Sequence, residues 1–201
     1  MSQIRLCTRP QVIYMNLLEA LSRESRLSML KAQHESVERR DLTAEAGYYT
    51  FVMDDHSTLV YVIIDQSTSI PYLLLSGPSA EEAARLLYET GMVGSADEVI
   101  QWCLQADTTE DKMDAICRLG IASYFLPRHD IVEIFTRYMQ DTDVRVRQSA
   151  VFATSFVGWQ DFEPILLRTA ERDPDERVSM IAESAIRIMR ESDWKAEKTT
   201  R

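Results

Sequence analysis

Residues 141–156 read Asp141-Thr-Asp143-Val-Arg145-Val-Arg-Gln-Ser-Ala150-Val-Phe-Ala153-Thr-Ser-Phe156, and residues 173–188 read Asp173-Pro-Asp175-Glu-Arg177-Val-Ser-Met-Ile-Ala182-Glu-Ser-Ala185-Ile-Arg-Ile188. The second block follows the first at a constant offset of 32 residues, with the aspartates, the arginine and both alanines at matching places. Self-similarity at such a period predicts a helical-repeat array, in which each unit buries its apolar face against its neighbours.

Each block has the features of a helix with a defined start. Asp141 and Asp173 can accept hydrogen bonds from the free N–H groups of a first helical turn. Pro174 suits the first helical position, where its missing N–H has no cost. The alanines lie on one helical face, where small side chains allow two helix backbones to approach closely.

The pattern D-x-D-x-R-V-x-x-x-A-x-x-A of residues 141–153 resembles the first helix of a HEAT-like repeat, as found in bacterial HEAT-repeat proteins. The resemblance covers residues 141–188 and implies an α-solenoid with a binding role. It also implies a structural ladder of ion pairs between layers, formed by Asp141 or Asp143 with Arg145, and by Asp175 with Arg177.

Helical pairs are predicted on both sides of these blocks. A degenerate block lies 33 residues upstream, where Met113, Cys117 and Gly120 replace Val146, Ala150 and Ala153. We therefore expect HEAT-like repeats over residues 79–191 and a frayed tail over 192–201. The expected pairs are 79–90 with 95–106, 109–124 with 129–140, and 142–157 with 161–172, closed by a helix over 174–190.

Residues 1–78 are expected to form an N-terminal cap on this array. Loosely spaced apolar residues predict helix over 10–38. Aromatic and β-branched residues predict strands over 48–53, 58–64 and 72–75, joined as a three-stranded antiparallel meander. The expected fold is therefore mainly α with a small β element.

The charge of the chain is concentrated in its middle. Of the formal net charge of −10, residues 47–140 contribute −9, from 5 basic and 14 acidic groups. Such a segment repels phosphate backbones, which argues against nucleic-acid binding. Two readings remain open: a solvated acidic surface, or a surface that binds a basic protein partner.

The sequence offers little that indicates catalysis or membrane insertion. It contains neither a run of about 18 apolar residues, as a membrane span requires, nor an apolar leader. Three scattered cysteines are typical of reduced thiols in a cytoplasmic protein. No phosphate loop, nucleophile elbow or paired-histidine metal motif is present, so no cofactor or metal is expected. Asp54-Asp55-His56 can bind a metal with help from elsewhere, although a solvated turn explains these residues equally well.

Candidate partner-binding residues come from the expected second helices, which line the concave side in HEAT-like proteins. Trp102, Thr136 and Arg168 hold equivalent positions there, although Trp102 can also pack beneath the cap. The other candidates are Gln105, Arg137, Met139 and Trp159, of which Trp159 can instead connect two helix ends. The expected function is a non-catalytic adaptor that binds a protein. The alternatives are an immunity protein that neutralises a basic toxin, and an enzyme on a HEAT-like scaffold such as a bilin lyase.

Overall fold

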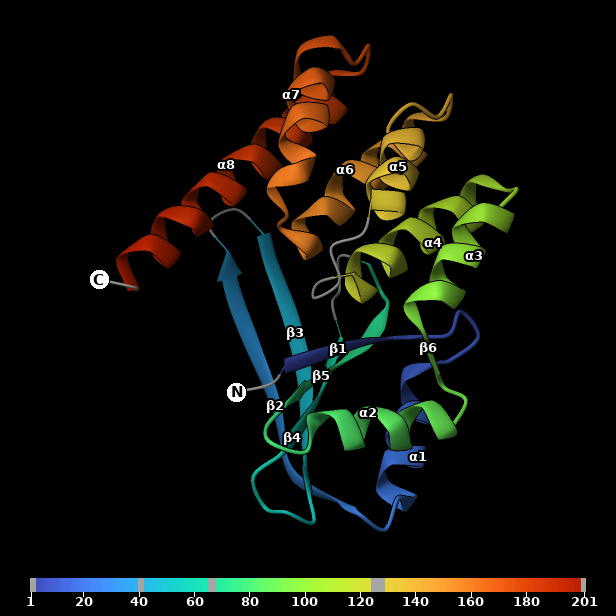
Figure 1. Ribbon diagram of the computed structural model, residues 1–201, viewed down its shortest axis with the longest axis vertical. Coiled ribbons are helices and arrows are strands. Elements are labelled where there is room, and N and C mark those ends of the chain that lie inside the picture. The colour runs from blue at the N-terminus through green and yellow to red at the C-terminus, as the bar shows by residue number, and fades with distance from the viewer. Residues whose placement is uncertain (1–2, 40–41, 65–67, 124–128, 200–201) are drawn as a thin grey trace. The chain divides into compact units, whose positions relative to one another are not determined.

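The computed structural model describes residues 3–39, 42–64, 68–123 and 129–199, with the backbone alone for 30–39, 42–48 and 191–199. Contacts divide the chain into two compact units, Met1–Glu98 and Val99–Arg201. The first unit is built on a sheet and the second on helices (Figure 1). The described chain is thus mainly helical with a β element, as expected from the sequence.

The first unit contains a six-stranded antiparallel sheet in the order β2-β3-β4-β5-β1-β6. Its strands are β1 (Gln3–Thr8), β2 (Leu27–Arg39), β3 (Leu42–Met53), β4 (Leu59–Ile64), β5 (Pro71–Ser76) and β6 (Val93–Gly94). The three strands expected from the sequence correspond to β3, β4 and β5, which pair in chain order. The expected three-stranded sheet was too small, because β1 and β2 join it at opposite sides.

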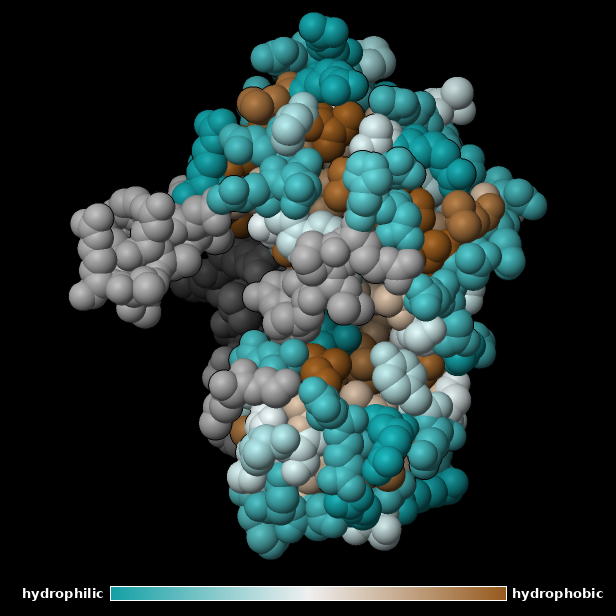
Figure 2. Space-filling view, viewed as in Figure 1, coloured by the Kyte–Doolittle hydropathy of each residue, from teal (hydrophilic) through white to brown (hydrophobic). Residues whose placement is uncertain are grey.

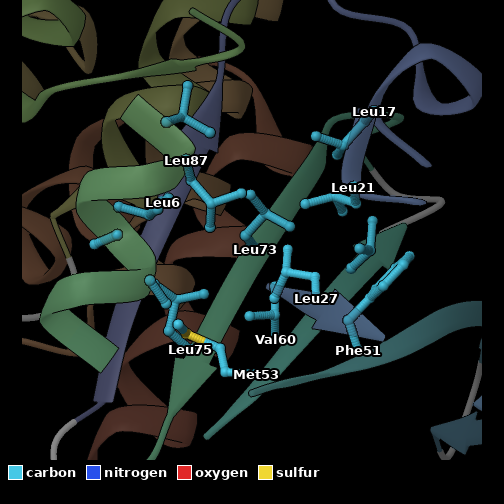
Figure 3. Packing of buried hydrophobic residues seen from close by; sticks show 14 of the residues in the cluster. Leu6, Leu17, Leu21, Leu27, Phe51, Met53, Val60, Leu73, Leu75 and Leu87 are labelled. Atoms are coloured by element: carbon cyan, nitrogen blue, oxygen red, sulfur yellow. The ribbon is translucent and has the colours of Figure 1, made fainter. Parts of the chain in front are cut away.

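Two helices, α1 (Tyr14–Arg23) and α2 (Ala80–Glu89), contribute to the core of this unit. Side chains alternate along each strand, so Leu6, Leu73 and Val62 fall next to one another on one sheet face. Figure 3 shows Leu6 and Leu73 of this face in one cluster with Leu17 and Leu21 of α1 and Leu87 of α2. The apolar faces of both helices are therefore buried against the sheet.

The prediction of helix over residues 10–38 is wrong for its second half. The helix ends at Arg23, and β2 begins at Leu27. β2 pairs along its whole length with β3, and cross-strand hydrogen bonding of this extent outweighs the helix propensity of residues 27–39. The spacing of Leu27, Leu30 and Val37 was too loose to indicate a helical face.

Residues 79–90 and 95–106 contain helices as expected, but these two helices do not form the first pair of the helical unit. α2 belongs to the sheet unit, where Ala80, Ala83 and Ala84 are buried in the same core as β1 and β5. The next helix, α3 (Ala96–Gln105), begins at the boundary between the units. The helical unit therefore starts about one helix later than the sequence pattern indicated.

The second unit consists of helices. They are the remainder of α3, then α4 (Thr109–Ala122), α5 (His129–Tyr138), α6 (Val144–Val157), a short 3-10 turn η1 (Gln160–Phe162), α7 (Glu163–Arg172) and α8 (Glu176–Thr199). α4 packs on α6, and α6 packs on α8, so these three helices lie side by side in chain order (Figure 1). α8 continues through most of the segment expected to form a frayed tail.

The packing of α4 on α6 depends on small residues. Ala150, Ala153 and Gly120 are all buried, and a Cβ atom added to Gly120 would lie 2.6 Å from the carbonyl oxygen of Ala153. The two backbones therefore touch at a point where only hydrogen fits. Ala182 and Ala185 of α8 are buried in the same way. Among the described helices, none is both long and apolar enough to cross a membrane.

Replacing Gly120 with alanine tests this close approach. The added methyl group gains up to about 1 kcal/mol of helix propensity, while overpacking costs up to about 3 kcal/mol. We expect a net loss of about 2 kcal/mol in the free energy of unfolding, measured by chemical denaturation. Ser155→Ala on the exposed side of α6 is the control and should leave stability nearly unchanged. A Gly120→Ala protein as stable as the wild type would show that α4 and α6 lie further apart.

Candidate partner-binding site

The turns before α6 and α8 share one aspartate arrangement. Asp143 is the N-cap of α6, and its carboxylate accepts a hydrogen bond from the Arg145 N–H at 2.9 Å. Asp141 lies two residues earlier, and its carboxylate accepts a hydrogen bond from the Asp143 N–H. Asp173 and Asp175 repeat both bonds before α8. The capping role expected of Asp141 and Asp173 therefore belongs to Asp143 and Asp175, because the helices begin at Val144 and Glu176.

A buried ion pair links these two turns. The Arg147 guanidinium donates to both oxygens of Asp173, at 2.8 and 3.0 Å, and the side chains are only 11% and 5% exposed. Arg147 Nη1 also donates to the Asp141 carbonyl at 3.1 Å. In the preceding turn, Lys112 Nζ lies 2.8 Å from Asp141 Oδ2. Each aspartate turn therefore forms an ion pair with a basic residue of an earlier helix. Lys112 of α4 contacts the turn before α6, and Arg147 of α6 contacts the turn before α8.

The expected ion pairs of Arg145 with Asp143 and of Arg177 with Asp175 are present, but neither pair links two layers. Arg145 contacts Asp143, and Arg177 contacts Asp175, each two residues away in the same turn. Arg145 also reaches Glu110 of α4 at 3.2 Å, but both side chains are more than half exposed. The buried connection between turns is made by Arg147 and Lys112, which the repeat alignment did not single out, because Ser179 replaces Arg147 in the second block.

A cleft of about 340 Å³ opens beside the Arg147–Asp173 pair, and we name it the Arg168 cleft. It is lined by Met139, Gln140, Asp141, Arg147, Ile165, Arg168, Thr169, Arg172, Asp173 and Pro174. Met139 and Ile165 are buried apolar residues, whereas Arg168 and Arg172 are exposed and stand one turn apart on α7. Neither of these two guanidinium groups forms an ion pair or hydrogen bond with another described residue.

A second cleft of about 340 Å³ lies one helical pair earlier, and we name it the Arg137 cleft. It is lined by Leu104, Ala106, Asp107, Lys112, Arg137, Tyr138 and Asp141. Arg137 donates to the Cys103 carbonyl at 3.3 Å and lies over the ring of Tyr138. Both clefts therefore combine an apolar wall, an arginine of the second helix and a cation–aspartate link between turns.

The residues predicted to bind a partner are only partly brought together. Met139 and Arg168 line the Arg168 cleft, and Arg137 lines the Arg137 cleft. Trp102 and Gln105 lie on α3, half-buried and exposed respectively, and line neither cleft. Ile165 and Arg172 were missed, although the spacing of Arg168 and Arg172 on one helical face was a usable signal.

Thr136 and Trp159 have local structural contacts. The Thr136 hydroxyl donates to the Val132 carbonyl of its own helix at 2.8 Å. The Trp159 ring stacks on Phe162, with ring planes 4° apart and centroids separated by 5.6 Å. Phe162 is fully buried and also contacts Phe135. Trp159 therefore packs on the start of α7, as a residue that connects two helix ends does.

Much of the acidic segment is engaged within the protein. Asp54 and Glu82 share Arg26, Asp114 pairs with Arg118, and Glu98 pairs with Arg9. The Arg26 guanidinium lowers the pKa of both Asp54 and Glu82. Since Arg9 and Arg26 come from outside residues 47–140, the negative charge of that segment is partly balanced by the fold itself.

The described residues contain few groups suited to catalysis. No cluster of three or more His, Cys, Asp or Glu in this part of the chain could hold a metal ion. In the turn at Asp54-Asp55-His56, Asp55 accepts hydrogen bonds from the N–H groups of Ser57 and Thr58 and from the Thr58 hydroxyl. All three cysteines are buried, and burial raises the pKa of the Cys103 thiol to about 12. That thiol therefore stays protonated at neutral pH.

Figure 2 shows how polar and apolar atoms are distributed on one face of the molecule. Hydrophilic side chains cover most of the helical unit on this face, and hydrophobic residues emerge between them in separate patches.

A scan against protein-family models finds no match to the chain, and neither a search of curated proteins nor one of solved structures finds a match.

Removing either arginine of the α6 turn distinguishes the two candidate ladder pairs. Arg147→Ala leaves the buried Asp173 carboxylate without its partner, which should cost about 3 kcal/mol of unfolding free energy. Arg145→Ala removes only exposed contacts and should change stability little. Urea denaturation of both variants measures the difference, and equal losses would contradict the assignment of Arg147 as the buried link.

The aspartate turns also predict a loss of stability in acid. Hydrogen bonds from Arg145 and Arg177 lower the pKa of Asp143 and Asp175 from 3.8 to about 2. A carboxylate with a lowered folded-state pKa stabilises the protein above its unfolded pKa, and this contribution disappears as pH falls through the folded value. Stability should therefore fall between about pH 4 and pH 2.

The variant Asp143→Asn/Asp175→Asn isolates this contribution, because asparagine still accepts the capping hydrogen bond but does not ionise. Its denaturation midpoint should decrease less steeply than that of the wild type over the same pH range. Identical pH profiles for the two proteins would mean that these two carboxylates do not stabilise the fold through their charge.

Proposed function

We propose that the protein is a non-catalytic adaptor with a HEAT-like helical array, which binds an acidic segment of another protein at the Arg168 cleft. The array assignment is supported by three features. Two sequence blocks repeat at an offset of 32 residues, α4, α6 and α8 pack in series, and successive aspartate turns are linked by Lys112 and Arg147.

The observation that carries the functional proposal is the pair of exposed arginines beside an apolar wall. Arg168 and Arg172 have no described ionic partner, whereas neighbouring Arg147 is fully engaged by Asp173. An arginine can bind a carboxylate through two parallel hydrogen bonds, and a solvent-exposed one keeps this capacity available. Met139 and Ile165 supply an apolar surface for an adjacent side chain of the same segment.

The charge balance favours an acidic segment over the basic partner expected from the net charge. The Arg168 cleft presents Arg147, Arg168 and Arg172 against Asp141 and Asp173, which leaves one net positive charge. Several carboxylates of residues 47–140 are already paired with arginines of the protein itself. Electrostatic complementarity of this kind contributes to specificity and to the association rate.

The test uses affinity capture from the native cells, with the wild type and the Arg168→Glu/Arg172→Glu variant as baits. Captured proteins are identified by mass spectrometry and then bound to both baits in purified form. We expect at least a tenfold weaker dissociation constant for the variant, because two attractive contacts become repulsive. Hydrogen exchange of the purified complex should show protection around residues 139–141 and 165–173.

The matched control is Arg23→Glu/Arg85→Glu, which changes the net charge equally at exposed positions of the sheet unit. This variant should bind the partner as the wild type does. If the cleft variant and the control bind equally well, or if protection lies outside the Arg168 cleft, the assigned site is wrong. Catalytic turnover that depends on this cleft would contradict the non-catalytic role.

A further inference from the structure

A larger hollow lies between α7 and α8, apart from both clefts. It encloses about 790 Å³ and is lined by Leu167, Ala170, Glu171, Glu183, Ile186, Arg187 and Arg190. Leu167 is 39% exposed, and Met180 of α8 is 58% exposed. We name this surface the α7–α8 groove. Leu167 lines this groove as an exposed large apolar side chain that a partner can cover.

The charges around this groove are balanced. Two carboxylates, Glu171 and Glu183, lie on the same surface as the two guanidinium groups of Arg187 and Arg190. Arg190 is bound by Glu163, with Nε 2.8 Å from the carboxylate. Glu171, Glu183 and Arg187 form no ion pair or hydrogen bond with any other described residue. The groove therefore offers acids and bases together, which suits a partner that also carries both.

We propose that a second copy of this chain occupies the groove, in a two-fold dimer in which the two α8 helices run antiparallel. Glu183 and Arg187 lie one turn apart on α8, about 6 Å along its axis. A two-fold axis that passes between them places Glu183 of one copy opposite Arg187 of the other, and the reverse contact follows by symmetry. Leu167, which lines the groove, is then covered by the second copy.

Charge complementarity selects this occupant over a protein of strong net charge. A strongly acidic partner would face Glu171 and Glu183, and a strongly basic partner would face Arg187; like charges at an interface are costly. A second copy places its Arg187 opposite Glu183 and its Glu183 opposite Arg187, so both of these unpaired charges gain an opposite neighbour. The proposal does not use the Arg168 cleft and is independent of the function proposed there.

Sedimentation equilibrium of the full chain tests the proposal with charge-reversed variants. The wild type should dimerise between about 1 and 200 µM, the range expected of a small interface. Glu183→Arg makes both positions basic, and Arg187→Glu makes both acidic, so each variant alone places like charges across the axis. Each dissociation constant should weaken at least tenfold.

An equimolar mixture of the two variants provides the decisive arm. In the mixed dimer every basic residue faces an acidic one, so the mixture should assemble as the wild type does while each component alone stays monomeric. Assembly of the mixture also shows that both variants are folded. Salt at high concentration should weaken the wild-type dimer, because these contacts lie at a solvated surface.

Three results would overturn the proposal. The first is a wild type that stays monomeric throughout the concentration range, which would leave the groove to a different protein. The second is a dimer that single charge reversals do not weaken. The third is a mixture that fails to assemble although both variants melt at the wild-type temperature. Each of these outcomes excludes the antiparallel pairing of α8 and leaves the Arg168 cleft unaffected.

Discussion

The helical unit depends on the ion pair between Arg147 and Asp173, which joins two successive turns at the wall of the Arg168 cleft. The pair is bidentate and almost fully buried, so its desolvation cost is met only while both partners remain in place. Arg147 also holds the Asp141 carbonyl, which fixes the turn before α6 relative to the turn before α8. The Arg168 cleft is lined by residues of both turns and of α7, so its shape depends on the distance at which this ion pair holds the two turns.

This arrangement in turn requires helices that pack closely. α4 and α6 touch at Gly120 and Ala153, where a methyl group would meet a carbonyl oxygen at 2.6 Å. Small residues at these positions set the distance between α4 and α6. At this distance, a lysine or arginine side chain is long enough to reach from one aspartate turn to the next. The close packing of α4 on α6 and the ion pairs between the turns therefore depend on each other.

The repeat pattern predicted the helical unit well because its contacts are local in sequence. The helices expected over 109–124, 129–140 and 142–157 correspond to α4, α5 and α6. The sheet was predicted less completely, because β1 pairs with β5 across more than 60 residues and nothing in residues 3–8 identifies that partner. α2 has alanines spaced for helix packing, yet they face the sheet, and periodicity alone does not specify which surface a helix meets.

The site was predicted in part for a similar reason. Equivalent positions on second helices indicated Arg168, and Met139 was found beside it, because repeat alignment identifies residues on one side of an array. Arg147 and Lys112 were missed because each side chain must extend from its own helix to the aspartate turn of the next block. In addition, Lys112 and Arg147 do not occupy equivalent positions in their blocks, so the alignment did not relate them. Arg172 was missed because the alignment gave no reason to consider an arginine without a counterpart in the other block.

A double-mutant cycle of Arg147→Met and Asp173→Asn, measured by urea denaturation, tests the buried link most directly. Each single substitution also changes the unfolding free energy through packing or capping. These contributions cancel in the cycle, which leaves the interaction free energy between the two side chains. We predict a coupling of about 2 kcal/mol, within the range measured for residues in direct contact. Additive effects of the two substitutions, with a coupling near zero, would show that Arg147 and Asp173 do not hold the successive turns together.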